Sequence, residues 1–470
     1  GRGTPMIVPQ NRLLFWAGVV LVPFLFLAIA FGPGAAVERP GVGRWEEVAG
    51  PLSWIVVAIF TALAALDALL ALNRLDGVSA SCPGIVRFSK GRDGAIPILI
   101  RNETGRIRRV RLGIPLPRSF RYDKEDVRAR LPEGGGASQI LWPCTPLERG
   151  NYRLDRVYVE TSSLLGFWAI RRSSATQTEI RVYPNLQQER RNLAALFLNR
   201  GTLGVHAQRQ IGKGREFEKL REYQPGDSYE DIHWKATAKR GHPITKTFQL
   251  ERTQEVYVVV DASRLSARVA PPRPEVPREI TDRTQLERFL TASLVMGLAA
   301  ERQGDLFGAL VYSDRIDAFV RARNGKAHYS ACRDAMYTLE PRVVNPDFEE
   351  LGAFIRLRMP RRALLVFLTN VDDPVLAESF LRMVDLIGRR HLVMVMMINP
   401  PGVRPIFSGR GVAAADDLYT ELAGHMHWHD LREFERSLHR RGASLHLVSN
   451  EHLCTELVTQ YLSVKQRQAL

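Results

Sequence analysis

The densest group of residues that could do chemistry lies between Leu220 and Gly241, in the run LREYQPGDSYEDIHWKATAKRG. Acidic and basic side chains are packed there around one tryptophan, so some of the charges must pair with each other. A group of this kind could form an active site or a docking site for a partner protein. Its members are Arg221, Glu222, Tyr223, Pro225, Gly226, Asp227, Asp231, Trp234, Lys235, Arg240 and Gly241.

The local pattern of the same run also suggests a purely structural role. The Pro-Gly pair at 225–226 predicts a turn, after which Asp227 is placed to cap a helix and Glu230 to complete a capping box. Gly241 would then end that helix. With Trp234 at its centre, the run could act as a structural clasp between the domains on either side. Because a helix cap, a helix stop and a central tryptophan already explain much of the segment, we favour the structural clasp.

Two weaker patterns suggest metal and phosphate chemistry. His425, His427 and His429, followed by Asp430, could bind a transition metal, but alternating residues share one face only in an extended segment. That segment directly precedes a predicted helix, so a surface loop is the favoured interpretation. The Lys-Gly pair at 213–214 resembles part of a phosphate-binding loop but lacks the full GxxxxGK(S/T) pattern, so we do not expect an ATPase. No GxSxG motif occurs, and no catalytic residue is assigned.

The composition bounds the classes of protein to consider. The chain has 470 residues, of which 45% are hydrophobic and 24% charged, with a formal net charge of +15. This length allows two or three domains, and the apolar fraction excludes an acidic disordered protein. The four cysteines lie far apart without a CxxC pair, which excludes a disulfide scaffold and a zinc ribbon. They are Cys82, Cys144, Cys332 and Cys454.

Two apolar segments near the N-terminus are long enough to cross a membrane. Residues 13–31 carry no charge, and residues 52–72 contain a single acid, Asp67, near their far end. At 1.5 Å per residue each segment spans the hydrocarbon core. A signal peptide and a buried core helix are the alternatives, but two consecutive segments favour a transmembrane hairpin over 13–72, after a short tail at 1–12. Asp67 lies where it could reach the interface or a partner helix.

Positive charges beside these segments predict their orientation. Arg12 precedes the first segment, and Arg74, Arg87 and Lys90 follow the second, whereas the loop between them carries charges of both signs. Cationic flanks stay in the cytoplasm. We therefore expect a multi-pass protein of the cytoplasmic (inner) membrane, with its soluble domains facing the cytoplasm. The sequence leaves open whether the start of the chain is Gly1 or Met6.

A β-sandwich is predicted for residues 79–184, where short β-rich segments alternate with turns. Between residues 80 and 190 there are 20 Lys and Arg against 11 Asp and Glu. A cation-rich face beside a membrane anchor could bind an anionic membrane surface, or it could be an ordinary solvated surface. Both interpretations stay open.

The remaining residues are expected to form a connector over 185–250 and an α/β domain over 251–470. In the latter, continuously apolar strands alternate with helical segments, which predicts a parallel sheet covered on both faces. Ligands of such sheets bind at the carboxyl ends of the strands. Residues 261–265, after the first strand, and 369–373, after a later one, are therefore the positions to inspect.

The run at 220–241 resembles the signature of the domain-of-unknown-function family 58. The segments at 149–152 (RGNY), 161–167 (TSSLLGF) and 182–184 (VYP) are similar to upstream elements of that family. The resemblance implies a C-terminal von Willebrand factor A-like domain of the Rossmann type and a MoxR-type AAA+ ATPase as partner. It implies no established chemistry.

The same resemblance raises the question of a Mg²⁺ site. A von Willebrand factor A domain needs a DxSxS turn after its first strand, plus a Thr and an Asp from later loops, whose hard oxygens bind Mg²⁺. Asp261 and Ser263 match, but Leu265 stands at the second serine and Asn370 at the expected aspartate. The acids at 372–373 could substitute. We expect this site to be degenerate, with no required cofactor and with Mg²⁺ possible but disfavoured.

Three classes of function remain. The favoured one is a membrane-anchored, non-catalytic adaptor or assembly factor that works with a MoxR-type AAA+ ATPase through protein–protein contact. The second is an enzyme of unknown chemistry that uses the charged cluster from Arg221 to Lys235. The third is a nucleic-acid-binding protein, suggested by the net charge, but the basic excess is spread along the sandwich, so no nucleic acid is expected.

Overall fold

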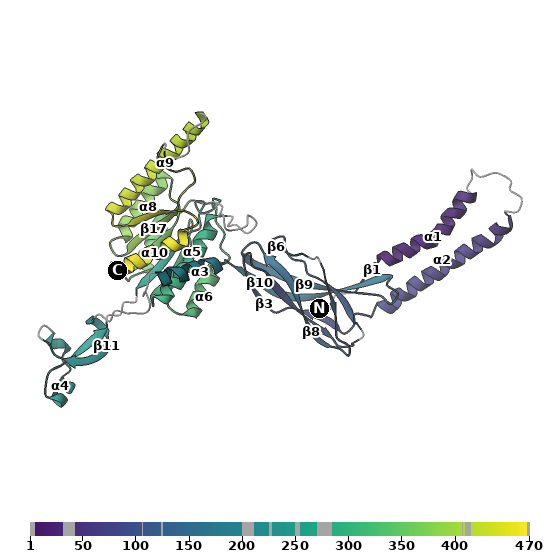
Figure 1. Ribbon diagram of the computed structural model, residues 1–470, viewed down its shortest axis with the longest axis horizontal. Helices are drawn as coiled ribbons and strands as arrows, with labels where there is room; N and C mark the ends of the chain where they lie inside the picture. Colours follow the sequence, from purple (N-terminus) through teal and green to yellow (C-terminus); the bar gives the residue numbers. More distant parts are fainter. Residues whose placement is uncertain are drawn as a thin grey trace. The chain divides into compact units, whose positions relative to one another are not determined.

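The computed structural model describes residues 5–31, 43–105, 107–123, 126–199, 211–224, 228–249, 254–269, 284–406, 408 and 415–467. The chain divides into two compact units, residues 1–183 and 184–470, which Figure 1 shows as ribbons.

The first unit begins with two helices that have contacts with each other, α1 (Asn11–Phe31) and α2 (Gly43–Ala71). Within the described residues, one helix segment, Trp54–Ala71 of α2, is long and apolar enough to cross a membrane, with a mean hydropathy of 2.3. The apolar stretch found in α1, Asn11–Val22, is shorter. A pair of membrane-spanning helices therefore stays a prediction.

Two β-sheets make up the rest of the first unit. One contains, in order, β1 (Met6–Pro9), β10 (Trp168–Tyr183), β9 (Gly150–Ser162), β5 (Arg109–Gly113) and β7 (Val127–Arg130), with β3 (Ile85–Ser89) beside β10. The other contains β2 (Val78–Ser81), β4 (Gly94–Asn102), β8 (Gly136–Pro146) and β6 (Phe120–Arg121). Alternate residues of β4, such as Ile96 and Ile98, point into a core shared with Val157 and Ile180 of the other sheet, as the two-residue period of a strand requires.

The second unit is built on a six-stranded sheet with the order β15-β14-β13-β16-β17-β18. Its strands are β13 (Glu255–Asp261), β14 (Leu306–Tyr312), β15 (Ile316–Arg323), β16 (Ala363–Leu368), β17 (Leu392–Ile398) and β18 (Ser444–Val448). All neighbouring strands are parallel except β15, which runs antiparallel to β14 at the edge. The chain order reverses at β13, and the carboxyl ends of strands at such a switch point are where α/β sheets bind ligands.

Helices cover both faces of this sheet, as the buried strands predicted. Val256 and Val258 of β13 pack toward α3 (Gln187–Asn199), α5 (Gln285–Arg302), α6 (Lys326–Met336) and α10 (Leu453–Gln466). The intervening Tyr257 and Val259 pack toward α7 (Phe348–Arg358), α8 (Pro374–Ile387) and α9 (Ala415–Arg440). Figure 1 shows α8 and α9 together on one side and α5 with α10 on the other.

Helix α3 lies in the segment that we expected to be a connector, yet it belongs to the core of the second unit. Leu186 and Leu193 are buried with residues of α5 and α10. Glu189 of α3 forms a buried ion pair with Arg288 of α5, at 3.1 Å between Oε1 and Nη1. Arg288 also donates hydrogen bonds to the side chain and main chain of Asn450, at 2.9 and 2.7 Å. These contacts fix α3 to the α/β unit.

The signature run is part of a hairpin, the signature module, made of residues 211–249. The strands β11 (Ile211–Glu222) and β12 (Ile244–Gln249) are antiparallel, and between them lie a 3₁₀ turn (Tyr229–Asp231) and α4 (Trp234–Arg240). Ile232, Ile244 and Thr245 are its buried residues among those with described side chains.

Candidate functional site

The signature module displays Trp234 instead of burying it. The indole begins α4 and is 69% exposed, so the expectation of a clasp with a buried tryptophan at its centre is wrong. The exposed surface of α4 also carries Lys235, Lys239 and Arg240. An aromatic ring among cationic side chains on one short helix is suited to contact with another macromolecule.

The helix that we expected directly after Asp227 begins later, at Trp234, and a different residue caps it. His233 occupies the N-cap position, and its Nδ1 accepts a hydrogen bond from the backbone N–H of Ala236 at 3.0 Å. The helix cannot begin earlier, since Ile232 is held in an extended bridge to Thr245 of β12. The predicted turn at Pro225 and Gly226 and the predicted cap Asp227, on which the capping box depends, lie outside the described residues.

The end of α4 agrees with the sequence. Gly241 adopts a left-handed conformation with φ of 77°, and its N–H donates to the carbonyl of Thr237 at 2.9 Å. Glycine is the residue that takes this conformation without a steric cost. The predicted helix stop is therefore confirmed.

The other signature residues are spread along the module. Tyr223 stacks on Tyr229 with ring centroids 5.8 Å apart, and Glu222 lies 3.3 Å from His242. Arg221 and Glu222 end β11, Asp231 ends the 3₁₀ turn, and Lys235 and Arg240 belong to α4. The module therefore brings aromatic rings together and places cations on its surface.

The second candidate site is the carboxyl edge of the central sheet, where Asp261 ends β13. Its side chain is fully buried. Oδ1 accepts a hydrogen bond from the N–H of Ser263 at 2.8 Å, and Oδ2 accepts one from the hydroxyl of Thr369 at 2.6 Å. Burial raises the pKa of the Asp261 carboxyl, and the hydrogen bonds from Ser263 and Thr369 oppose that shift. Burial, together with the charge of Asp261, likewise raises the pKa of the Tyr312 phenol.

The residues that break the DxSxS pattern have structural roles of their own. Leu265 is fully buried in the core between the sheet and helices α7 to α9. The side chain of Asn370 donates to Gln285 of α5 and accepts from the N–H of Ile398 of β17 at 2.9 Å. Asn370 therefore joins three elements at the sheet edge, and its amide oxygen is already used.

Two arginines hold the acids that could have substituted as metal ligands. Arg268 forms a two-point ion pair with Asp372, with Nη2 2.9 Å from Oδ1. Arg264 lies 3.4 Å from Asp373, which also caps α8 by accepting from the N–H of Val375 at 3.0 Å. Both arginines follow Ser263 in the loop after β13, so the loop that should present metal ligands supplies cations instead.

The residues at this edge do not fit a magnesium ion. Mg²⁺ is bound in near-octahedral geometry by oxygen ligands that include one or two carboxylates. Here Asp261 is bonded by two protein donors, and Asp372 and Asp373 are paired with guanidinium groups. Among the residues that the structure describes, no three His, Cys, Asp or Glu side chains are grouped to hold a metal ion.

Sequence reasoning missed Thr369 as the partner of Asp261. The only signal was its position, directly after the β16 strand, in the loop already singled out for inspection. It also missed the pairing of Arg268 with Asp372, which are 104 residues apart. No local pattern marks either contact.

The histidine-rich segment is helical, so the expectation of a surface loop is wrong. It lies in the middle of α9, where residues two apart point to different sides of the helix. His425 Nδ1 accepts from the N–H of Ile406 at 3.2 Å, whereas His427 Nε2 lies 3.7 Å from Asp372. These two imidazoles therefore have different neighbours and do not form a joint metal site.

The segment 161–167, which resembles an upstream family element, holds the end of α2. Ser163 donates to Oδ2 of Asp67 at 2.6 Å, and the N–H of Leu165 donates to Oδ1 at 3.1 Å. Trp168 donates its indole N–H to the carbonyl of Ala64 at 2.8 Å. Asp67 is therefore buried against the sandwich.

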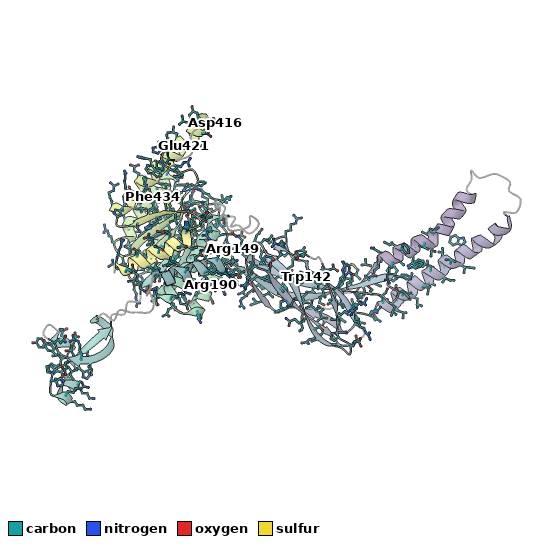
Figure 2. All side chains as sticks on the ribbon, viewed as in Figure 1. Trp142, Arg149, Arg190, Asp416, Glu421 and Phe434 are labelled. Carbon is teal, nitrogen blue, oxygen red and sulfur yellow. The ribbon has the colours of Figure 1, made fainter. Side chains whose placement is uncertain are left out.

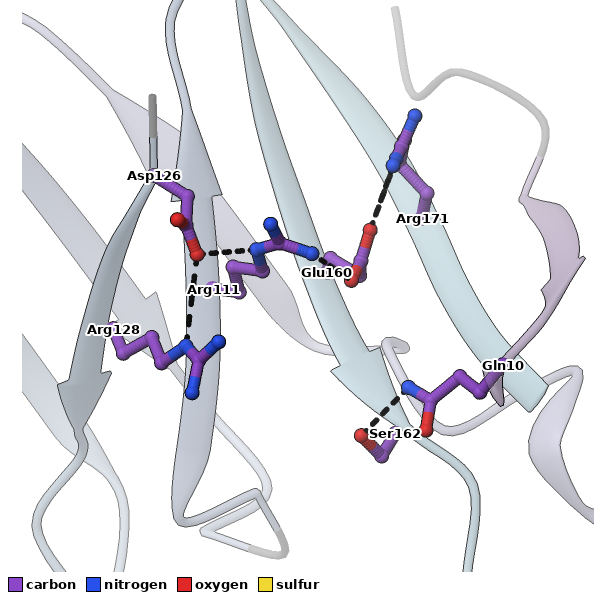
Figure 3. Close-up of polar contacts among 7 residues, drawn as sticks. All are labelled: Gln10, Arg111, Asp126, Arg128, Glu160, Ser162 and Arg171. Carbon is purple, nitrogen blue, oxygen red and sulfur yellow. Dashed lines mark hydrogen bonds and ion pairs between the residues drawn. The ribbon is translucent and has the colours of Figure 1, made fainter. Parts of the chain in front are cut away.

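Part of the cationic sandwich surface is neutralised by acids of the same sheet (Figure 3). Glu160 of β9 lies 3.4 Å from Arg111 of β5 and 2.8 Å from Arg171 of β10. Arg111 also pairs with Asp126, and this contact lowers the pKa of the Asp126 carboxyl. These two arginines serve the sandwich itself, so a membrane-binding face would have to use other cations.

Comparisons with known proteins agree with the family resemblance. Uncharacterised proteins of Mycobacterium bovis and Mycobacterium tuberculosis are 24% identical over 192 residues, which is 40% of this chain and 56% of each relative. The chain thus spans about half the length of these curated relatives.

Solved structures with some similarity include the SpRpn10 VWA domain, at 12% identity and a TM-score of 0.28, covering 44% of this chain and 95% of that one. The PilB minor pilin from Streptococcus sanguinis has 10% identity and a TM-score of 0.30, covering 86% of this chain and 98% of that one.

A family match covers most of the signature module and the sheet edge. Residues 219–404 match the family described as protein of unknown function DUF58.

Proposed function

We propose that this chain is a membrane-anchored, non-catalytic adaptor or assembly factor that acts with a MoxR-type AAA+ ATPase through protein–protein contact. One observation carries the proposal: the carboxyl edge of the central sheet is filled by the protein's own groups. Asp261 is bonded by Ser263 and Thr369, and Arg268 neutralises Asp372. Because the polar groups of this edge are already bonded within the protein, the edge favours surface contact with a partner protein over chemistry on a small ligand.

The strand arrangement supports a von Willebrand factor A-like α/β domain. The order β15-β14-β13-β16-β17-β18, with only β15 antiparallel, gives a doubly wound sheet with one reversed edge strand. Helices pack on both of its faces. In this proposal the domain is a rigid support for partner-binding surfaces.

The exposed apolar side chains of α2 support the membrane anchor. Trp54, Ile59, Leu66 and Leu69 are all more than half exposed, which is unfavourable in water and favourable in a hydrocarbon environment. The hydrogen bonds of Asp67 would hold the end of the span against the sandwich. We place the soluble units on the cytoplasmic side because of the basic residues that follow α2.

The signature module is the proposed contact surface for the ATPase. The exposure of Trp234 and of its neighbour Lys235 favours docking over the clasp. Exposed aromatic residues beside cations often contribute most of the binding energy at an interface.

Co-purification tests the proposal. The tagged full-length chain and a MoxR-type ATPase from the same genome are co-expressed, extracted in detergent and recovered on the tag. The ATPase should be retained by the wild-type chain and lost at least tenfold with Trp234→Ala or Lys235→Ala. Lys326→Ala, at an exposed lysine in α6, is the matched control and should retain it. An ATPase that never binds the wild-type chain would contradict the proposal.

A further inference from the structure

The first half of α9 carries an uncovered apolar stripe. Leu418, Leu422 and Met426 are spaced four residues apart and therefore lie along one side of the helix. They are 41%, 43% and 62% exposed, and the adjacent Tyr419 is 69% exposed. Figure 1 shows this end of α9 extending beyond the rest of its unit.

The strip of α9 next to this apolar stripe is already occupied by the loop after β17. Arg404 pairs with Glu421 at 2.8 Å, and the N–H of Ile406 donates to His425 at 3.2 Å. Gly424 lies so close to the carbonyl of Gly402 that a Cβ there would be only 2.2 Å from its oxygen. The loop after β17 thus fixes the orientation of the helix and, within the described residues, leaves the apolar stripe uncovered.

The stripe leads into a groove between α8 and the second half of α9. Met426, Asp430, Glu433 and Ser437 follow one another at helical spacings of four, three and four residues, so they lie along one side. The groove has a cavity volume of about 220 Å³. Its apolar lining includes Ala377, Leu381, Leu431 and Phe434. Figure 2 shows Glu421 toward the projecting end of α9 and Phe434 where the helix lies against the unit.

The rim of this groove is acidic. Glu378, Asp430 and Glu433 line it and are exposed. Among the described residues none of the three forms an ion pair, whereas Asp372, at one end of the groove, is held by Arg268. These three carboxylates give the rim a negative charge, although the chain as a whole has a net charge of +15. They favour a cationic partner and disfavour an anionic lipid surface.

We propose that the stripe and groove together bind an amphipathic helix of a partner protein whose apolar face is flanked by Lys or Arg. The apolar surface from residue 418 to residue 437 is roughly 28 Å long, at 1.5 Å per residue, which suits a helix of several turns. Apolar anchors at i, i+3, i+4 and i+7 of the partner fill the stripe and groove. Its basic residues pair with Glu378, Asp430 and Glu433. This interaction goes beyond the ATPase contact proposed for the signature module.

A designed peptide tests this surface without knowledge of the natural partner. The probe is a fluorescein-labelled helical peptide of Leu and Lys with apolar residues at those spacings. A Leu and Glu peptide with the same apolar pattern is the reference. The full-length chain is held in nanodiscs of zwitterionic lipid, with empty nanodiscs as the blank, and binding is followed by fluorescence anisotropy.

Two pairs of substitutions separate the charge from the apolar contribution. The pair Glu378→Lys with Glu433→Lys, and the pair Leu422→Glu with Met426→Glu, should each weaken binding of the Lys peptide at least tenfold. The wild-type chain should bind the Glu peptide at least tenfold more weakly. A matched control reverses two exposed acids at the start of α7, Glu349→Lys with Glu350→Lys, and should leave binding unchanged.

Several results would overturn the proposal. Equal affinity for the two peptides, or affinity unchanged by the groove substitutions, would do so. Sedimentation in which the wild-type chain self-associates through Leu422 would assign the face to a second copy. Flotation with anionic vesicles that is lost in Leu422→Glu would assign it to a membrane.

The milder pair Glu378→Gln with Glu433→Gln keeps the test valid if a charge reversal fails to fold. Because no ATPase is present, failure here leaves the co-purification result to stand on its own.

Discussion

The hydroxyl of Ser163 lies 2.6 Å from the carboxylate of Asp67, although the two residues are 96 positions apart in the chain. The backbone N–H of Leu165 bonds the other carboxylate oxygen. A single acid near the end of an apolar helix thus accepts two hydrogen bonds from one turn of the sandwich. This places the only charged side chain of the apolar segment Trp54–Ala71 inside the protein.

Removal of this acceptor should loosen the end of α2. In Asp67→Ala the buried hydroxyl of Ser163 loses its partner, at a cost of about 1–3 kcal/mol, and the N–H of the half-exposed Leu165 loses its acceptor. Hydrogen exchange at the Leu165 amide in the detergent-extracted chain should become faster. Asp67→Asn keeps a carbonyl acceptor and should change exchange much less. Equal protection in wild type and Asp67→Ala would show that the contact does not hold the helix.

Magnesium should not stabilise the α/β unit. A ligand that binds only the native state stabilises it by RT ln(1 + [L]/Kd), which is about 2.7 kcal/mol at a hundredfold excess over Kd. Millimolar Mg²⁺ should therefore leave the melting temperature unchanged in a thermal scan. Asp261→Ala should lower stability with or without the ion, because Thr369 and Ser263 lose their acceptor. A Mg²⁺-dependent rise in melting temperature that is absent in Asp261→Ala would contradict this.

Two tryptophans should respond differently to truncation. Trp234 is 69% exposed and Trp142 only 1%. Trp234→Ala should change the free energy of unfolding by less than about 1 kcal/mol, since it leaves no cavity. Trp142→Ala in the sandwich core should cost about 3–5 kcal/mol. Chemical denaturation of the two variants measures the difference, and a large loss in Trp234→Ala would restore the clasp.

The buried pair of Arg288 and Glu189 should show strong coupling. Arg288→Met removes the guanidinium that neutralises the Glu189 carboxylate in a region with almost no solvent, at a cost of about 3–5 kcal/mol. Replacement of both residues by Met should recover most of that loss, because no charge then stays buried. A double-mutant cycle measures the coupling. Additive effects of the two single substitutions would mean that the pair does not act as a unit.

Acid should destabilise the α/β unit through His391. Burial lowers the pKa of this imidazole from its ordinary 6.5 to about 4, and within the described residues neither ring nitrogen has a hydrogen-bond partner. Between pH 6.5 and pH 4 the unfolded chain therefore takes up a proton that the native state does not. The free energy of unfolding therefore decreases by at most about 3 kcal/mol as the pH falls from 6.5 to 4.

Replacement of the imidazole isolates its share of the acid sensitivity. His391→Leu should flatten the decline in the free energy of unfolding between pH 6.5 and pH 4 relative to wild type. His439→Leu, at an exposed position of α9, should leave the decline unchanged. Identical pH profiles for wild type and His391→Leu would refute the assignment.

The elements that sequence reasoning predicted correctly are those with a strong local period. Continuous apolar runs such as 256–260 and 363–368 became buried parallel strands, and Gly241 ended its helix because only its own backbone conformation was needed. The first half of α9 was not predicted, because it lacks a strong local period of this kind. None of its described side chains from 416 to 430 is buried, so its apolar residues do not form the pattern of a core-facing helix.

The amino-acid sequence alone thus determined the buried strands of the α/β sheet, the apolar segment of α2, and the run at 220–241 whose family match extends over 219–404. The tertiary structure decided the exposure of Trp234, the partner of Asp67 and the closure of the sheet edge by Arg268. The physical reason is distance along the chain. Periodicity reports which side of an element faces the core, but a hydrogen bond or ion pair between residues about 100 positions apart exists only once the chain has folded.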